Sequence, residues 1–448
     1  MAKRILLAFL FVLQFMYKGD YKIMRNKKFI INGNVLVSYK GKDEIVVIPE
    51  GIQEIFIHCF WNNRYVKKIV IPEGVKIIYY GAFNGCINLE EIEVPDTIEK
   101  IDEEIVAGCG KLKYNFIDNN KYLGNKNNPK VILSEYGDNK ASEVVIDEGV
   151  RIIDVDVFRE FSSLKRVSIA DTVTQISKSA FCECENLEEV KMSKGLLYID
   201  AFAFQYCTSL KNADLYEGVK RIDMYAFDMC DNLKTLSIPN SITKIVDDAL
   251  STYELTYYKW ENGLYLGNKD NNYVVFVRME DKGASVLKIH ENTKIIYKRA
   301  CEKCENLKEV YIPNGVTQIG PSAFRDCVSL IKANIPTSIL EIDSSAFMGC
   351  KSLKKVEFPI HEIKIWDCAF FRCDSLKEIS INDAYIDDNA FGGCQKLEKV
   401  TLGSNIKSLG DYCFYGCKKL KNVKMRKDIK KSDTTFGKCQ DIEFEYIN

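Results

Sequence analysis

This chain has few histidines, few prolines and almost no net charge. The low net charge and the few histidines limit the functions that the protein can have. The 448 residues include 3 histidines and 9 prolines, and 62 basic residues balance 63 acidic ones to a formal net charge of −1. A balanced charge gives no overall basic field for nucleic acid and no polybasic membrane signal. With three histidines, a Ser/His/Asp triad would have to be assembled across distant segments. Nucleic-acid binding is therefore excluded, and no enzyme activity is expected.

Long apolar runs are also missing, apart from one short stretch at the N-terminus. A basic start precedes 11 mostly apolar residues from Ile5 to Phe15. This arrangement fits a secretory signal peptide, although no small-x-small cleavage site follows, and it is too short for a spanning helix of ~20 residues. Residues 1–23 are predicted to be a signal-like segment or anchor, a start-site artefact ahead of Met24, or an ordered N-terminal element. No transmembrane span is expected.

The dominant feature that is present is an internal repeat of the form AF-x-x-C-x-x-L-x-x-V-x-I-P. Within blocks it advances by 23 residues, except for steps of 21 and 22 residues near the C-terminus. Such a period is the signature of a stacked fold, in which each turn buries its apolar edge only against its neighbours. The fifteen cysteine-equivalent positions are Asn63, Cys86, Cys109, Phe161, Cys184, Cys207, Cys230, Tyr253, Cys304, Cys327, Cys350, Cys373, Cys394, Cys417 and Cys439.

Each repeat predicts one main strand. Val310 and Ile312 alternate with Glu309 and Tyr311, and a period of two predicts a half-buried strand. Proline cannot donate to a strand ladder and belongs just past the strand end, where seven of the 9 prolines, such as Pro313, stand. The predicted fold is a repeat solenoid of about fifteen ~23-residue turns, with one main strand per turn, little regular helix and β-hairpin insertions.

Two interruptions divide the array into blocks. Each contains a YLGN segment and an Asn-rich stretch between β-rich arms, which predicts a hairpin at Lys121–Leu133 and at Leu264–Phe276. Residues 29–48 are predicted to form a third hairpin. The expected organisation is one continuous solenoid: a hairpin plus three repeats in 24–112, a hairpin plus five repeats in 113–254, and a hairpin plus seven repeats in 255–448.

The repeat resembles that of the BspA-type leucine-rich repeat family, through AFNGCINLEEIEVP (Ala82–Pro95), AFRDCVSLIKANIP (Ala323–Pro336) and AFMGCKSLKKVEFP (Ala346–Pro359). The resemblance covers about 29–448 and implies a leucine-rich-repeat solenoid. Family members are often surface or secreted proteins of bacteria and protists, and some bind host matrix proteins or other cells. The family has no catalytic residues to transfer. This chain lacks an obvious cell-wall sorting motif, which puts a wall-anchored adhesin in doubt.

The 17 cysteines are interpreted as packing residues, since free cysteine behaves as a small buried hydrophobe. Twelve of them occupy the repeat position. Cys301 and Cys304 form the only C-x-x-C, and a zinc site would need a second pair or nearby histidines. Because the three histidines lie in different turns, no metal site and no cofactor are predicted. A redox or metal role for Cys301 and Cys304 stays open as an alternative.

A partner is expected on the face built by the main strands, because solenoids usually bind there. Tyr311 is the best aromatic candidate on a polar face of mixed sign, and the hairpin residues Tyr122, Tyr265, Tyr273 and Trp260 are rival contact points. The first hypothesis is a non-catalytic interaction protein for a protein or cell-surface ligand, at or outside the bacterial surface. The alternative is a cytoplasmic scaffold that starts at Met24. The predicted partner-binding residues are Glu309, Tyr311, Lys332, Asn334, Lys355 and Glu357.

Overall fold

The computed structural model shows a β-solenoid of about 18 turns. It describes residues 24–25, 28–250, 255–406 and 408–447, and among these no α-helix occurs. The predicted solenoid is confirmed. The count exceeds the fifteen predicted turns because each of the three hairpin segments contributes a further turn. The signal-like segment predicted at 1–23 lies outside the described residues. No helix in the described part is long and apolar enough to cross a membrane.

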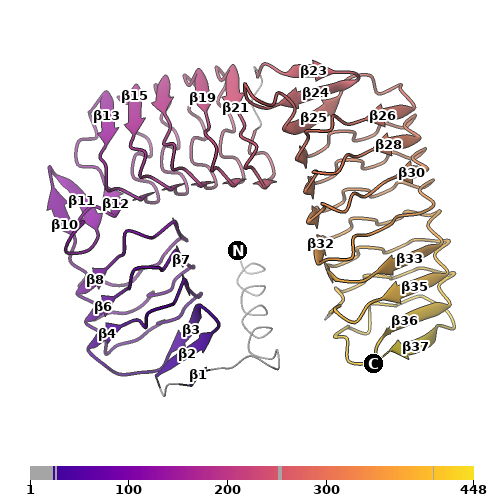
Figure 1. Cartoon of the computed structure of the whole chain (residues 1–448), viewed down its shortest axis with the longest axis horizontal. Helices are drawn as coiled ribbons and strands as arrows, with labels where there is room; N and C mark the ends of the chain where they lie inside the picture. Colours follow the sequence, from indigo (N-terminus) through magenta and orange to yellow (C-terminus); the bar gives the residue numbers. More distant parts are fainter. Residues whose placement is uncertain (1–23, 26–27, 251–254, 407, 448) are drawn as a thin grey trace. The chain divides into compact units, whose positions relative to one another are not determined.

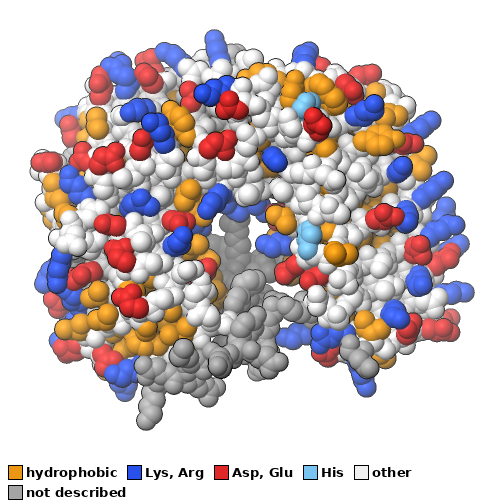
Figure 2. All heavy atoms as spheres, in the orientation of Figure 1, with side chains coloured by type: hydrophobic (Ala, Val, Ile, Leu, Met, Phe, Trp, Pro, Cys, Tyr) orange, Lys and Arg blue, Asp and Glu red, His pale blue; other side chains and the backbone are white. Residues whose placement is uncertain are grey.

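Two compact units make up the chain, one mainly up to Ala213 and the other mainly from Glu254 onward, with the intervening segments divided between them. In both units successive turns stack with their strands in parallel (Figure 1). Charged side chains of both signs are intermixed over the face seen in Figure 2.

A typical turn contains two strands rather than the single main strand of the prediction. β28 (Glu309–Tyr311) is the predicted main strand, and β29 (Gln318–Ile319) is a second, short strand in the same turn. Each pairs in parallel with its equivalent one turn away, since Val310 lies opposite Ala333 and Ile319 opposite Ile342. A two-residue strand carries too little alternation to be recognised from sequence.

The main strands build one set of sheets. In the first unit they are β4 (Ile45–Val47), β6 (Lys68–Val70), β8 (Glu91–Glu93), β13 (Glu143–Ile146), β15 (Arg166–Ile169) and β17 (Glu189–Lys191). β19 (Asn212–Asp214) lies where the units divide. In the second unit they are β21 (Thr235–Ser237), β26 (Val286–Lys288), β28, β30 (Lys332–Ala333), β33 (Glu378–Ile381), β35 (Lys399–Leu402), β36 (Asn422–Arg426) and β37 (Glu443–Ile447).

The short strands build the other set. In the first unit they are β5 (Glu54–Ile55), β7 (Ile77–Ile78), β9 (Lys100–Ile101), β14 (Ile152–Ile153), β16 (Gln175–Ile176) and β18 (Tyr198–Ile199). In the second unit they are β20 (Arg221–Ile222), β22 (Lys244–Ile245), β27 (Ile295–Ile296), β29, β31 (Glu341–Ile342), β32 (Ile363–Ile365) and β34 (Ala384–Ile386).

The three predicted hairpins are present as antiparallel strands that open each short-strand sheet. The one predicted over 29–48 is shorter, because Ile45–Val47 forms the main strand β4, which pairs in parallel with β6. The first comprises β1 (Met24–Arg25), β2 (Phe29–Asn32) and β3 (Val35–Tyr39). The second comprises β10 (Asn115–Ile117), β11 (Asn120–Leu123) and β12 (Ile132–Glu135). The third comprises β23 (Tyr258–Trp260), β24 (Gly263–Leu266) and β25 (Val275–Met279).

Between the sheets, the repeated Ala, Phe and Cys side chains belong to extended buried cores, one from Leu36 to Ile152 and another from Tyr265 to Ile429. Phe324 and Phe347 are fully buried and stack with ring centroids 5.1 Å apart. The thiol of Cys350 donates to the carbonyl of Phe324 at 3.1 Å. The same thiol-to-carbonyl bond recurs one turn after another, so the repeated cysteine both fills the core and satisfies a buried backbone acceptor.

The YLGN segment joins a hairpin to the last main strand of the preceding block. The carbonyl of Gly124 accepts a bond from the Val94 N–H at 3.0 Å, and the Asn125 side chain donates to the Val94 carbonyl at 2.9 Å. A Cβ on Gly124 would lie 2.3 Å from the carbonyl oxygen of Asn128, so only glycine fits there. The third hairpin repeats these backbone contacts with Ile238, Gly267 and Asn268.

A buried glutamine side chain hydrogen-bonds to the backbone on the otherwise unpaired edge of the last short strand before each interruption of the repeat array. Ile101 in β9 donates its N–H to Gln175 Oε1 and accepts from Gln175 Nε2, both at 2.8 Å. Ile245 in β22 is held in the same way by Gln318, at 3.1 and 3.2 Å. A side-chain amide thus replaces the backbone of a neighbouring strand.

Candidate functional site

Tyr311 is the centre of the predicted binding face and is 44% exposed. It projects from β28, and its hydroxyl donates to Glu309 Oε2 at 2.8 Å, which raises the pKa of Tyr311. Lys332 Nζ from the next turn lies 5.9 Å from the centre of the Tyr311 ring, within cation–π range. These three predicted residues therefore come together.

Asn334 is exposed as predicted, but its amide is already occupied. Its Oδ1 accepts from the Ile312 N–H at 2.9 Å and its Nδ2 donates to the Ile312 carbonyl at 2.7 Å. The side chain thus extends the main-strand sheet and fixes the backbone beside Tyr311. Lys355 and Glu357 lie one turn further on and form an exposed ion pair at 2.6 Å, apart from the depression described next.

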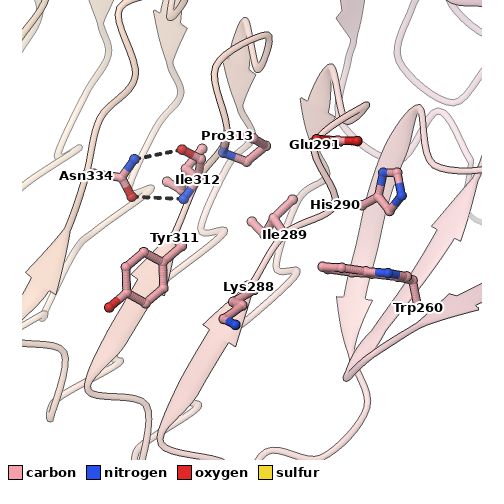
Figure 3. Close-up of a pocket in the computed structure, with 9 residues that line it drawn as sticks. All are labelled: Trp260, Lys288, Ile289, His290, Glu291, Tyr311, Ile312, Pro313 and Asn334. Atoms are coloured by element: carbon pink, nitrogen blue, oxygen red, sulfur yellow. Dashed lines mark hydrogen bonds between the residues drawn. The ribbon is translucent and has the colours of Figure 1, made fainter.

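A solvent-open depression of about 560 Å³ lies beside Tyr311. Figure 3 shows Trp260 of the third hairpin on one side and Tyr311 on the other, with Lys288 and Ile289 between them. His290, Glu291, Ile312, Pro313 and Asn334 complete the lining. Two aromatic side chains, charged groups of both signs and an open mouth suit contact with a macromolecular surface.

His290 is held rigidly at the rim. Its ring stacks on Tyr273 with centroids 3.8 Å apart and meets Trp260 edge to face at 5.0 Å. Nδ1 accepts from the Asn292 N–H at 3.2 Å, so the neutral ring carries its proton on Nε2. Burial lowers the pKa of His290. The imidazole is therefore a neutral donor near pH 7.

The hairpin side chains proposed as rival contact points divide into two groups. Tyr265 is fully buried and Tyr122 is only 4% exposed, so the prediction of these two as contacts is wrong. Both rings pack into the core beneath their hairpins. Trp260 and Tyr273 are half-buried, and Trp260 lines the depression.

Sequence reasoning missed His290, although a signal was present. His290 stands where seven other turns have proline just past the main strand. The departure from the repeat marks the turn that receives the hairpin. The sequence alone did not show that His290 belongs to a site, because only the folded hairpin places Trp260 beside it.

Cys301 and Cys304 lie in the core, where burial, followed by the hydrogen bond between them, raises the pKa of Cys301, and the same hydrogen bond lowers the pKa of Cys304. Both are fully buried. A buried thiol with a raised pKa is a poor nucleophile. In the part of the chain that the structure describes, no cluster of three or more His, Cys, Asp or Glu residues is arranged to hold a metal ion.

The profile of the BspA type leucine-rich repeat region matches residues 38–127, 134–256, 280–385 and 364–447, in 6 copies. The chain belongs to the BspA type leucine-rich repeat family. This confirms the resemblance found in the repeat motifs. The matched residues include β26 and β28, but not the third hairpin that carries Trp260. The BspA type family is a family of repeat scaffolds that are generally non-enzymatic.

Solved bacterial leucine-rich repeat structures are similar to this BspA type chain. One from Bacteroides ovatus is 23% identical, with 96% of this chain and 98% of that chain covered and a TM-score of 0.33. One from Eubacterium ventriosum is 22% identical, with 70% and 89% covered and a TM-score of 0.38. A leucine-rich cell surface protein from Faecalibacterium prausnitzii is 20% identical, with 90% and 92% covered and a TM-score of 0.28. No curated protein matches this chain.

Proposed function

We propose that this protein is a non-catalytic interaction solenoid that recognises a partner protein through the depression between Trp260 and Tyr311. The observation that carries the proposal is the exposed Tyr311 ring across an open depression from Trp260. Tyrosine and tryptophan are enriched among the few residues that contribute most of the binding energy of protein interfaces. Asn334 and Tyr273 hold the lining in place, so a partner would bind with little loss of side-chain freedom.

The contact is proposed to occur at or outside the bacterial surface, in recognition or adhesion. Membership of the BspA type family and the signal-like sequence of residues 1–23 support this location. The alternative is an intracellular scaffold that begins at Met24. Mass spectrometry of the native N-terminus in culture supernatant, envelope and cytosol distinguishes the two. A mature chain starting near residues 17–24 outside the cytosol supports export, whereas a formylated Met24 found only in cytosol contradicts it.

Binding is tested with the purified chain on immobilised extracellular-matrix proteins, using surface plasmon resonance. Tyr311→Ala and Trp260→Ala are each expected to weaken any saturable binding at least tenfold. The matched control is Lys355→Ala with Glu357→Ala, since this pair was predicted on the same face and lies outside the depression. Equal affinity of Tyr311→Ala and the unaltered chain for a bound matrix protein would refute the site.

A further inference from the structure

A second exposed aromatic surface lies in the first block, on the turns rather than on the main strands. Trp61 is 60% exposed, Tyr65 49% and Ile87 50%. Together with the exposed side chains of Lys42 and Arg64, these residues define the Trp61 surface. Tryptophan, tyrosine and arginine are the residue types most enriched in interface hot spots.

The five side chains lie on three successive turns of the first unit. Arg64 and Ile87 are 23 residues apart and occupy the same position in adjacent turns, which stack ~4.8 Å apart. The Asn88 side chain donates to the Arg64 carbonyl at 2.8 Å and ties these turns together. On the other side, Lys42 Nζ lies 5.2 Å from the centre of the Tyr65 ring.

The backbone beneath the surface is fixed by hydrogen bonds. Asn63 Oδ1 accepts from the N–H groups of Tyr65 and Val66 at 2.9 and 3.1 Å, and Asn63 Nδ2 donates to the Gly41 carbonyl at 3.1 Å. Asn63 stands at a position that most other turns fill with cysteine. A polar residue here thus anchors the loop that carries Trp61 and Tyr65.

Trp61 is exposed because the next turn offers it no recess. At the same repeat position Phe371 packs over Gly392, where an added Cβ would approach its ring to 3.0 Å. The residue in the turn after Trp61 is Asn84 rather than glycine. Trp61 therefore remains outside the core. Its ring contacts that of His58 at 5.8 Å between centroids, and its backbone N–H donates to the His58 carbonyl at 3.0 Å.

The charges that remain unpaired at this surface are positive. Neither Lys42 nor Arg64 forms an ion pair with any described residue. The neighbouring acids are already engaged, since Glu44 pairs with Lys67 at 2.8 Å and Asp43 with Lys28 at 2.7 Å. An incoming carboxylate would therefore meet two available cations beside exposed aromatic rings.

We propose that the Trp61 surface binds an acidic peptide segment of a partner protein, with an apolar side chain of the peptide against Trp61 and Ile87 and its carboxylates at Arg64 and Lys42. This site shares no residue with the depression at Tyr311, so the experiment on it tests neither the depression nor the proposed function. The arginine fork favours carboxylates through paired hydrogen bonds.

Selection from a phage-displayed library of random dodecapeptides against the full chain tests the proposal. Enriched peptides are expected to carry a net negative charge together with Leu, Phe or Trp. A synthetic peptide of the enriched sequence should lose at least tenfold in affinity for Trp61→Ala and for Arg64→Glu. The control Phe116→Ala, which removes an exposed aromatic ring of the first unit outside the Trp61 surface, should bind it unchanged.

Three results would overturn the proposal. Selection could enrich nothing, or it could enrich peptides without excess negative charge. Binding could also survive both Trp61→Ala and Arg64→Glu. Vesicles containing phosphatidylglycerol serve as the rival anionic probe, and Arg64-dependent binding of vesicles without any peptide binding would assign the surface to a membrane instead. Since Trp61 and Arg64 are largely exposed, unchanged circular dichroism is expected for both variants.

Discussion

Gln175 takes the place of a neighbouring strand for Ile101, which lies 74 residues earlier in the chain. Its side-chain amide bonds the Ile101 N–H and carbonyl at 2.8 Å each, as a parallel strand would. Gln175 is itself fully buried. The sheet that ends at β9 is thereby closed without another strand, and the second interruption uses Gln318 and Ile245 for the same purpose.

Gln318→Ala should destabilise the second unit by about 1–3 kcal/mol, because it leaves the buried backbone groups of Ile245 unsatisfied. The effect should be local, so hydrogen exchange at the Ile245 amide is the measurement. Asn314→Ala, an exposed substitution in the same turn, is the control and should leave that amide protected. Unchanged protection of Ile245 in Gln318→Ala would show that the amide does not hold the edge.

Stability should depend on pH through Asp343, whose carboxylate accepts from Gln318 Nε2 at 2.5 Å. Burial, followed by the nearby Glu341, raises the pKa of Asp343 to about 7. Lys244 and Asp247 also face this group, and Lys244 pairs with Glu341 at 2.6 Å.

A carboxyl group with a raised pKa in the folded state stabilises the fold while protonated. The free energy of unfolding should therefore fall as pH rises from about 4 to about 7, by roughly 1.4 kcal/mol per unit of pKa difference. Asp343→Asn should reduce this dependence without abolishing it, because burial also raises the pKa of Asp154 to about 6. The exposed Asp231→Asn should leave the dependence unchanged. Urea unfolding at pH 5 and pH 8 is the measurement, and parallel pH profiles for Asp343→Asn and the unaltered chain would contradict the assignment.

Phe324→Ala should destabilise the chain by ~3–5 kcal/mol, as expected for truncation of a fully buried phenylalanine. The lost ring stacks on Phe347 at 5.1 Å. Denaturant unfolding measures the change. A near-neutral result would mean that the repeat register is wrong.

Native thiols should resist alkylation, because burial raises the pKa of core cysteines such as Cys350. Iodoacetamide labelling followed by peptide mass spectrometry should modify Cys301, Cys304 and Cys350 only after denaturation. Half-buried Cys368 should also react slowly, since its pKa is raised to about 12. Rapid native labelling of Cys304 would revive the redox hypothesis for the C-x-x-C pair.

Much of the candidate site was predictable, because it is built from the repeat. The alternation around Val310 placed Tyr311, Glu309 and Lys332 outward on adjacent turns, where the structure has them. The occupied amide of Asn334 was not predictable, since its bonds to Ile312 depend on how two turns stack. The burial of Tyr265 could not be inferred either, because a hairpin pattern does not say which face meets the core.

The sequence by itself determined the solenoid, its turns and its core, since apolar residues recurring every 23 positions can be buried only by stacking. Tertiary structure decided how Gln175 reaches Ile101, how Trp260 meets His290, and why Trp61 stays exposed. The first two contacts join residues that do not occupy equivalent positions in the repeat. The exposure of Trp61 depends on which residue stands at the same position in the next turn. A local pattern specifies what each turn must bury, whereas packing between turns selects which of the remaining side chains face a partner.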